Sequence, residues 1–475
     1  MSEHSIFKTF LAIGACRLTR GLLRLFHRGG TTLPGRSALT FDKKILEVVS
    51  QGMHIIVVTG TNGKTTTCSM LRNAFQESGI DPLSNISGAN LLSGITAEFA
   101  SQATLSGKPK KSYAIVECDE GALKQVAPLI KPEVIVVTNL FRDQLDRYGE
   151  IMHTLNEIRT GISLVPEAVL CLNSDCSLTA SLASDVSNPV YFFGIGKTAV
   201  AENNTDTAEE QDSSPSDAKY CIRCGTEYDY SYHTYAHLGG FSCPNCDYKR
   251  KRPELEVTSI ESTSRRSDII IRIADTQVRV HVGLPALYNI YNAIAALAAF
   301  ESAGLDRQKM ITSLASVKSS FGRMEGFIYN NVDIQMILVK NPAGCNQTLD
   351  YLSSLNEEYV AVLCLNDKTA DGHDISWIWD VDHEKIIEDP FCKKIYVSGT
   401  RARDMKIRLK YGNAKEENIR MIRSNEKLLS AVTEDKLPVY ILPNYTAMLK
   451  LRTILSSATG RNEFWKDQKY VNKKH

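Results

Sequence analysis

Residues 54–66 read His-Ile-Ile-Val-Val-Thr-Gly-Thr-Asn-Gly-Lys-Thr-Thr, a short apolar run that leads directly into a glycine loop. The β-branched residues of the run predict a strand over His54–Thr59, and a helix should follow from Thr65 to Ser78 and stop at Gly79. A loop between a strand and a helix N-terminus can close its backbone amides around phosphate oxygens, and the helix dipole favours the negative charge. This stretch therefore predicts an α/β fold with a nucleotide site.

The loop residues have separable expected roles. The candidate ATP contacts are Gly60, Thr61, Asn62, Gly63, Lys64, Thr65 and Thr66. The ammonium of Lys64 would reach the β- and γ-phosphates, and the hydroxyl of Thr65 would hold Mg²⁺. Val58 stands where the longer phosphate loop has its first glycine, so this is a shortened form, G-T-N-G-K-T. A chance loop is the alternative, and the flanking strand and helix patterns disfavour it.

Other apolar runs extend the α/β pattern along the chain. Strands are predicted at Tyr113–Glu117, Val134–Thr138 and Ala168–Leu172, and in a second unit at Asp333–Val339, Tyr359–Leu365, Lys394–Ser398 and Val439–Leu442. Continuous apolar strands separated by helical lengths are typical of a parallel sheet covered on both faces. We expect a central P-loop domain with a parallel sheet and a smaller α/β C-terminal domain.

Composition excludes some classes of protein. A length of 475 residues indicates two to three domains, and 43% hydrophobic residues allow a sizeable core. The net charge of +1 gives no sign of a nucleic-acid-binding surface. Eight of the twelve cysteines are scattered singly, which is typical of reduced thiols in a cytosolic protein.

The other four cysteines form two Cys-x-x-Cys pairs. Cys221 and Cys224 are separated from Cys243 and Cys246 by eighteen residues, a spacing that predicts a closed, structural zinc ribbon with four thiolates. Two redox pairs are the alternative. His233 and His237 are not expected to be ligands, and the tyrosines at 228, 230, 232 and 235 are expected to form the core of the ribbon rather than to stack on bases. The basic run Lys249–Arg252 is interpreted as a solvated face or a contact for anionic lipid.

The N-terminal segment Ile6–Phe26 has apolar residues partly at helical spacing. It predicts an amphipathic helix that packs on its own protein, with a membrane-surface helix, its arginines toward lipid head groups, as the alternative. No transmembrane segment or signal peptide is expected.

The acidic stretch Ala201–Ala218 predicts a disordered loop. The expected domains are 1–45 (N-terminal helix and lead-in), 46–318 (central), 219–253 (ribbon insertion) and 319–475 (C-terminal).

With these motifs in place, the sequence resembles the Mur ligase superfamily, whose members carry the shortened loop G-T-[NK]-G-K-[ST]. Matching segments follow in the same order at Glu117, Thr138–Asp146, Leu172–Asp175, Asn289–Ala293 and Gly322–Glu325. The resemblance implies that Glu117 holds a second Mg²⁺, that Asn292 faces adenine and that Arg323 approaches the nucleotide phosphates; Asn139 is a further candidate for nucleotide binding. It also implies a ligase that activates a carboxylate with ATP as an acyl phosphate, which an amine then attacks.

Within that superfamily the chain resembles the MurT family, the ATP-using subunits of lipid II isoglutaminyl synthases. The ribbon insertion and the segments Val339–Asn346, Ala370–Asp380, Gly399–Ala402 and Pro443–Thr446 carry this resemblance. It implies amidation of the α-carboxyl of D-glutamate in the lipid II stem peptide, with ammonia from a GatD-type glutaminase subunit that docks on the C-terminal domain. Asp374 matches an aspartate that serves the glutaminase active site; a helix N-cap or a loop acid before Ser376 is the alternative. The implied location is the cytoplasm, and contact at the inner face of the cell membrane is a further expectation.

Some positions depart from the family patterns. Gln144 and Tyr288 replace histidines, and Lys340 stands where ordinary ligases have an aspartate near the ribose.

Two other functions remain open from the sequence. One is a free-standing Mur-like ligase that adds an amino acid. The other is a zinc-ribbon NTPase that binds nucleic acid, against which the neutral net charge counts.

Overall fold

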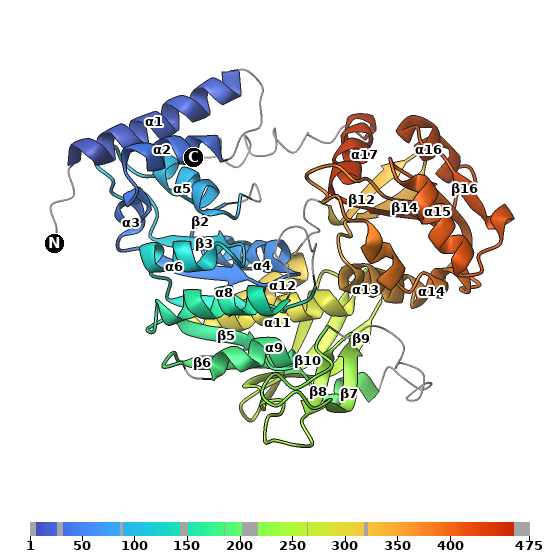
Figure 1. Cartoon of the computed structure of the whole chain (residues 1–475), viewed down its shortest axis with the longest axis horizontal. Helices are drawn as coiled ribbons and strands as arrows, with labels where there is room; N and C mark the ends of the chain where they lie inside the picture. Colours follow the sequence, from blue (N-terminus) through green and yellow to red (C-terminus); the bar gives the residue numbers. More distant parts are fainter. Residues whose placement is uncertain are drawn as a thin grey trace. The chain divides into compact units, whose positions relative to one another are not determined.

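The computed structural model describes residues 6–25, 32–85, 89–142, 151–184, 186–201, 217–263, 265–317 and 322–459. The chain divides into two compact units (Figure 1). The first contains most of the chain up to Val317, and the second contains the chain from Lys318 onward. Each unit has its own sheet.

The first unit is built on a nine-stranded sheet with the order β11-β10-β9-β6-β5-β4-β1-β3-β2. Its strands are β1 (His54–Thr59), β2 (Leu83–Ser84), β3 (Tyr113–Glu117), β4 (Val134–Val137), β5 (Val169–Asn173), β6 (Val190–Ile195), β9 (Leu255–Ser262), β10 (Ser267–Ile273) and β11 (Thr276–Val282). Strands β1 to β6 and β9 pair in parallel, whereas β9, β10 and β11 form an antiparallel meander. The phosphate loop therefore leaves the carboxyl end of a central parallel strand.

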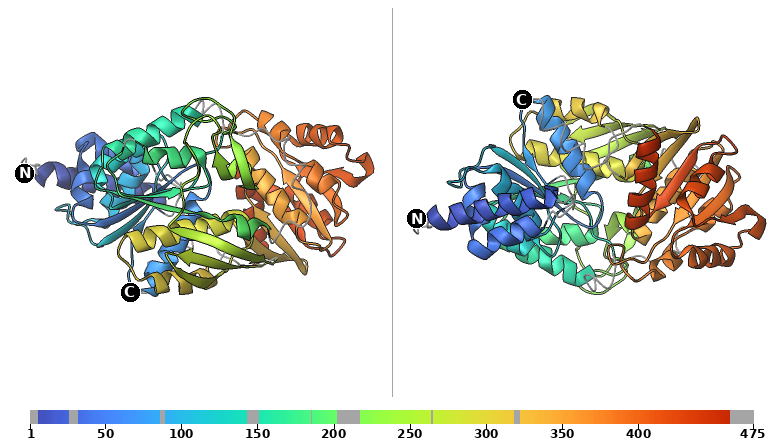
Figure 2. Two further views of the ribbon diagram at one scale, coloured as in Figure 1. Left: turned by 90° about the horizontal axis from the view of Figure 1, so that it is seen from below. Right: turned by 90° about the horizontal axis from the view of Figure 1, so that it is seen from above.

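Helices cover this sheet on both faces. They are α4 (Lys64–Glu77), α5 (Leu92–Gln102), α6 (Leu123–Ile130), α8 (Ile151–Ser163), α9 (Ser177–Ala180), α10 (Lys197–Ala201), α11 (Leu287–Ser302) and α12 (Arg307–Ser316), with the 3-10 turn η1 (Ser181–Ala183). Helix α4 packs on α11 and α12, and α6 packs on α8 (Figure 2). Every residue of β4 is buried, as is β1 beyond His54. Strands buried along their whole length must be covered on both sides, so the predicted parallel sheet is confirmed.

Three helices precede β1: α1 (Ile6–Leu25), α2 (Leu33–Phe41) and α3 (Ile45–Ser50). Helix α1 packs on α2 and α5 through the fully buried Ala12, Ile13 and Cys16. The favoured interpretation, a helix packed on its own protein, is confirmed. Within the described residues, no helix has the length and hydropathy needed to cross a membrane.

The cysteine-rich insertion contains the antiparallel hairpin of β7 (Asp229–Tyr235) and β8 (Leu238–Ser242). The acidic stretch before it, residues 202–216, lies outside the described residues, so the predicted disordered loop is not tested.

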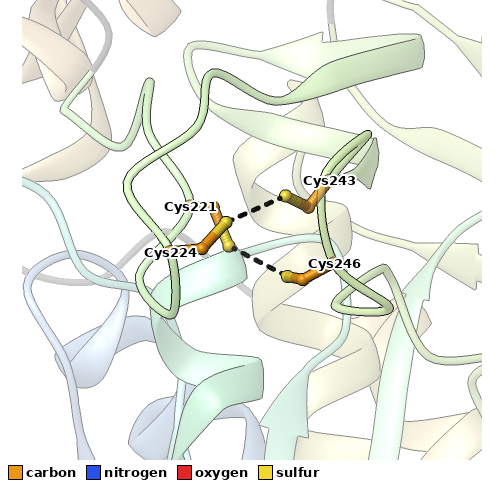
Figure 3. Close-up of side chains that lie close together, drawn as sticks. All are labelled: Cys221, Cys224, Cys243 and Cys246. Atoms are coloured by element: carbon orange, nitrogen blue, oxygen red, sulfur yellow. Dashed lines mark hydrogen bonds between the residues drawn. The ribbon is translucent and has the colours of Figure 1, made fainter.

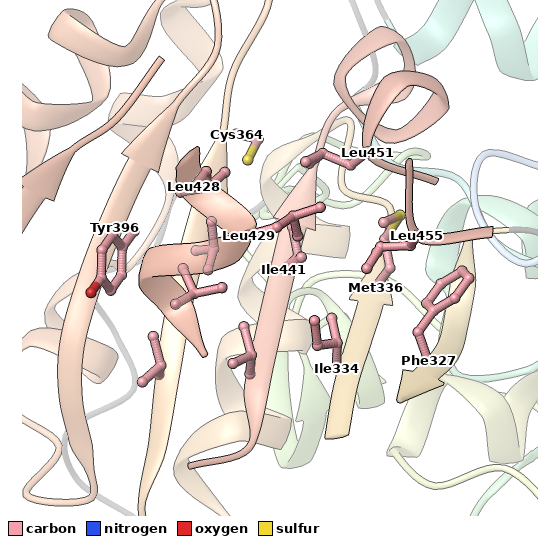
Figure 4. Packing of buried hydrophobic residues seen from close by; sticks show 14 of the residues in the cluster. Phe327, Ile334, Met336, Cys364, Tyr396, Leu428, Leu429, Ile441, Leu451 and Leu455 are labelled. Atoms are coloured by element: carbon pink, nitrogen blue, oxygen red, sulfur yellow. The ribbon is translucent and has the colours of Figure 1, made fainter. Parts of the chain in front are cut away.

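The second unit has a six-stranded sheet with the order β12-β13-β17-β14-β15-β16. Its strands are β12 (Arg323–Tyr329), β13 (Val332–Ile337), β14 (Tyr359–Cys364), β15 (Cys392–Ser398), β16 (Ile419–Met421) and β17 (Val439–Pro443). The helices are α13 (Pro342–Ser353), α14 (Glu384–Ile387), α15 (Ala402–Tyr411), α16 (Asn425–Val432) and α17 (Tyr445–Ala458), with 3-10 turns η2 (Ser376–Asp380) and η3 (Glu416–Asn418). All pairs are parallel except β12 with β13. Figure 4 shows strand residues such as Ile334, Met336 and Ile441 packed against Leu428 and Leu451 from the helices.

Candidate functional site

The phosphate loop between β1 and α4 depends on its two glycines. Gly60 has φ +116° and Gly63 has φ +90°, both in the left-handed region that side chains rarely adopt. A β-carbon at Gly63 would lie 2.0 Å from the Oδ1 of Asn292, on α11. One at Gly60 would lie 2.8 Å from the carbonyl oxygen of Asn139. The loop therefore runs close to both neighbouring segments, and Asn292 lies beside it, while its contact with adenine stays a prediction.

The segment after β4 holds this loop in place. The Thr61 amide donates to the carbonyl oxygen of Asn139 at 2.9 Å, and the Asn62 amide donates to the Oδ1 of Asn139 at 2.9 Å. The hydroxyl of Thr138 donates to the Asn62 carbonyl at 2.7 Å. In the structure Asn139 therefore holds the loop through two hydrogen bonds to its backbone amides, and a direct contact of Asn139 with nucleotide stays a prediction.

The loop opens onto the N-terminus of α4. The first hydrogen bond of this helix runs from the Thr67 amide to the Gly63 carbonyl at 2.9 Å. The amides of residues 64–66 precede that bond and have no acceptor within the helix, which makes the helix start suited to a phosphate group. Thr65 is half-buried there, and Thr66 is buried.

Lys64 is the first residue of α4 and is buried. Its ammonium donates to the Oε1 of Glu120 at 2.7 Å and also to the carbonyl oxygen of Gly60. Burial alone would lower the pKa of Lys64, but the neighbouring carboxylates, Glu120 foremost, outweigh burial and raise it. Lys64 is therefore cationic, as a lysine that neutralises phosphate charge must be.

Three buried acids lie at the carboxyl end of β3: Glu117 is its last residue, and Asp119 and Glu120 follow it. The backbone of Glu117 is fixed by Asn85, whose side chain accepts from the Glu117 amide at 2.9 Å and donates to its carbonyl at 2.7 Å. All three carboxylates act on the charge of Lys64. The family resemblance implies a role for Glu117 and none for Glu120, although the pattern Glu-x-x-Glu at a strand end is a signal for both.

Asp175 lies in the segment after β5. An acid at the end of a strand is usually solvated, but Asp175 is not. It is fully buried, and its Oδ1 accepts from the Nε of Arg250 at 2.6 Å. Its Oδ2 accepts from the Ile195 amide and from the hydroxyl of Tyr291, both at 2.7 Å. These partners occupy both oxygens, so Asp175 ties β6, α11 and the end of the ribbon insertion together.

This ion pair also corrects the interpretation of the basic run Lys249–Arg252. The side chain of Arg250 is only 14% exposed and pairs with both Asp175 and Glu256. The other three residues of the run are exposed. Arg250 is therefore an internal anchor rather than part of a solvated or lipid-binding face.

The four cysteines of the insertion converge (Figure 3). The sulfur atoms of Cys221, Cys224, Cys243 and Cys246 all lie within 4.8 Å of one another. The Sγ atoms of Cys221 and Cys246 are 3.7 Å apart, and those of Cys224 and Cys243 are 3.4 Å apart. None of the four forms a disulfide. Such a cluster has the ligand set and the compactness of a metal site.

The predicted tyrosine core of the ribbon forms in part: Tyr228 and Tyr230 belong to it, whereas Tyr235 packs on the rest of the first unit. Tyr228 and Tyr248 pack with Cys221, Cys243 and Phe241 in a small core. At the far end of the hairpin, Tyr235 stacks on Phe141 with ring centroids 5.7 Å apart. The Phe141 amide in turn donates to the hydroxyl of Thr61 in the phosphate loop at 3.1 Å.

Neither histidine of the insertion belongs to the cysteine cluster. His237 is fully buried beside Cys176, with its Nε2 3.4 Å from that sulfur, and burial lowers its pKa to about 3. His233 is exposed and stacks on Tyr230 with ring centroids 4.0 Å apart.

Two predicted site residues belong to the second unit. Arg323 begins β12 and is half-buried, and the nearby Glu325 is held by an ion pair with Arg452 at 3.0 Å. Asp374 is half-buried before η2, and its Oδ1 accepts from the Ser376 amide at 2.8 Å. This turn is the geometry expected of the alternative, a loop acid before Ser376. Gln144, in contrast, lies outside the described residues.

Comparison with known proteins decides the family. Residues 58–223 match the model of the Mur ligase middle domain, and residues 338–448 match that of the MurT ligase C-terminal domain. The chain is 35% identical to the lipid II isoglutaminyl synthase (glutamine-hydrolyzing) subunit MurT of Streptococcus pneumoniae, over 95% of this chain and 97% of that protein. The chain belongs to the MurT family of Mur ligases. The MurT subunit of Staphylococcus aureus strain COL is 33% identical, over 93% of this chain and 96% of that protein.

Solved structures agree with this membership at the level of the fold. A pseudomurein peptide ligase type C from Methanothermus fervidus superposes with a TM-score of 0.63, covering 85% of this chain and 78% of that chain at 22% identity. The predicted architecture, a Mur-ligase-like α/β fold with a C-terminal domain, is confirmed. The cysteine cluster is thus part of a MurT-family ligase fold.

Proposed function

We propose that this chain is the ATP-using ligase subunit of a lipid II isoglutaminyl synthase. It would amidate the α-carboxyl of D-glutamate in the stem peptide of lipid II to D-isoglutamine, a step of peptidoglycan synthesis. The observation that carries the proposal is the 35% identity to a named MurT subunit across 95% of the chain. The phosphate loop and its buried acids support it, because they match what carboxylate activation by ATP requires.

The proposed chemistry needs no protein nucleophile. A carboxylate oxygen of D-glutamate attacks the γ-phosphorus of ATP and ADP leaves, which gives an acyl phosphate. Ammonia then attacks the acyl carbon, and phosphate leaves as the amide forms. The protein must therefore orient the reactants and neutralise the charge that moves between phosphate oxygens.

The described residues around the loop fit that task. Lys64 and the amides at the start of α4 would hold the phosphates, with Gly60 and Gly63 allowing the close approach. Mg²⁺ would be held by Thr65 and Glu117, and it would supply charge neutralisation to the phosphates. Glu120 fits the same role as Glu117, because it is a buried carboxylate 2.7 Å from the ammonium of Lys64. Asn292 would face adenine, and Arg323 would approach the phosphates.

We assign zinc to the cysteine cluster as a structural ion. A tetrahedral Zn²⁺ with Zn–S bonds of about 2.3 Å sets its sulfur ligands about 3.8 Å apart. The sulfur distances of 3.7 and 3.4 Å within the two pairs fit that arrangement. Four thiolates complete the coordination sphere, so this ion would stabilise the insertion and take no part in catalysis.

The partner in this proposal is a GatD-type glutaminase that docks on the C-terminal domain, residues 319–475. The relatives support a partner, because their names call them subunits of a glutamine-hydrolyzing synthase. Asp374 would orient a histidine of the glutaminase, since a Cys-His pair needs a third group to fix its imidazole. With a lipid-linked substrate, the complex would work in the cytoplasm at the inner face of the cell membrane.

The role of Asp374 can be separated from the ligase reaction. With a co-expressed glutaminase, Asp374→Asn should lower glutamine-driven amidation of lipid II by about 10²-fold or more, as loss of an imidazole-orienting carboxylate does in other triads. The same variant should keep amidation driven by an ammonium salt, because ammonia then bypasses the glutaminase. Asp404→Asn, in the first turn of α15, is the matched control and should leave both activities unchanged. Equal loss with glutamine and with ammonium would refute the partner role.

A further inference from the structure

Helix α1 has two apolar faces, and the fold of the first unit covers one of them. The buried face contains Thr9, Ala12, Ile13 and Cys16, which pack toward α2 and α5. At 100° per residue, the opposite side of the helix carries a second row within an arc of about 120°. Its members are Phe7, Phe10, Leu18, Leu22 and Leu25. A surface helix of a globular protein is normally polar on the side away from its core.

These side chains are strongly exposed. Phe7 is 68% exposed, Leu18 is 67% and Leu25 is 72%. Leu33 and Phe41 at the two ends of α2 are also about half exposed, at 50% and 49%. Of the nineteen large hydrophobic side chains that are exposed among the described residues, eight lie between residues 6 and 41. Such a concentration marks an interaction surface rather than scattered surface residues.

The charge of this segment has one sign. Residues 4–41 contain six lysines and arginines and no aspartate or glutamate, in a chain whose net charge is only +1. The guanidinium groups of Arg17 and Arg20 bond to α5 and the segment after it, through Ala103, Glu98 and Ser101. Lys8 and Arg36 are exposed. An apolar face on a segment that carries only basic charges is complementary to an anionic lipid surface.

We propose that the exposed face of α1 inserts into the interface of an anionic bilayer, with the helix lying flat. The helix is packed along its other face, so it would rest on the membrane rather than cross it. A second copy of the chain would bring two basic surfaces together, which disfavours it as the occupant. The idea that this surface brings the protein to a lipid-linked substrate rests on the proposed function. Binding of the surface to lipid can be tested without any ligase activity.

The test is flotation of the full chain with vesicles of phosphatidylglycerol and phosphatidylcholine, compared with vesicles of phosphatidylcholine alone. The double variant Leu18→Asp with Leu22→Asp places two charges on the apolar face. The matched control is Ile407→Asp, since Ile407 is 49% exposed on helix α15. A Phe7→Trp variant reports insertion directly through a blue shift of its added fluorescence.

We expect the wild type and the control to float with anionic vesicles, less so at high salt, and the double variant to bind at least about tenfold more weakly. In detergent micelles all three proteins should amidate lipid II alike. If none of them amidates lipid II while flotation is as expected, the proposed function is refuted and the membrane proposal is not. Equal flotation of wild type and double variant, or no shift for Phe7→Trp, would overturn the membrane proposal. So would a lipid-free dimer that the double variant dissociates, because a second copy would then cover the face.

Discussion

Gly63 in the phosphate loop must be glycine for two separate reasons. Its φ of +90° disfavours any side chain, and a β-carbon would also collide with the amide of Asn292. Gly52 isolates the first reason, because it has φ +76° and a β-carbon there would meet no atom within 4 Å. Alanine substitutions at Gly52 and Gly63 can therefore be compared to separate the effect of backbone strain from the effect of crowding beside Asn292.

We predict that Gly63→Ala lowers the affinity for Mg²⁺-ATP at least about tenfold, because the loop or Asn292 must move. Gly52→Ala should cost about 1 kcal/mol of stability and bind nucleotide normally. Isothermal titration calorimetry, with thermal unfolding of both variants, measures the two effects. Equal affinities for the two variants would show that Asn292 does not border the nucleotide site.

At the scale of elements, Arg250 fastens the ribbon insertion to the sheet. Removing its side chain leaves the carboxylate of Asp175 fully buried without its cation. We predict that Arg250→Ala destabilises the first unit by about 3–5 kcal/mol, the usual cost of breaking a buried ion pair. Lys251→Ala, one residue further along the same basic run and exposed, should change stability by less than about 0.5 kcal/mol. Urea unfolding measures both, and similar midpoints for the two variants would contradict the anchoring role.

Local pattern was enough to predict several of these elements. The strands β1 and β3 have the predicted bounds, and α4 begins one residue earlier than predicted. The meander of β9, β10 and β11 was missed, although β10 alternates between buried and half-buried residues with period two. The ion pair of Asp175 and Arg250 could not be predicted, because it joins residues 75 positions apart and no local pattern records such a contact.

At the scale of the whole molecule, the order of motifs predicted the family and the two α/β sheets. The cysteine spacing likewise predicted a cluster that the fold does bring together. The local pattern could not predict the surroundings of each acid. Glu117, Glu120 and Asp175 all lie at or just after the end of a strand, yet two of them act on the charge of Lys64 and the third is enclosed by Arg250 and Tyr291. Burial and partners depend on the tertiary structure, so residue type and strand position alone do not separate a candidate metal-binding acid from a structural one.

The most direct test of the central claim is mass spectrometry of lipid II after incubation with the protein, Mg²⁺-ATP and an ammonium salt. We predict the mass change of one carboxylic acid converted to an amide, and its loss in Lys64→Ala, because the buried ammonium beside the phosphate loop is needed for phosphoryl transfer. Unchanged lipid II with the wild type, in the presence of a co-expressed glutaminase and glutamine and with ATP still hydrolysed, would contradict the assignment of this substrate.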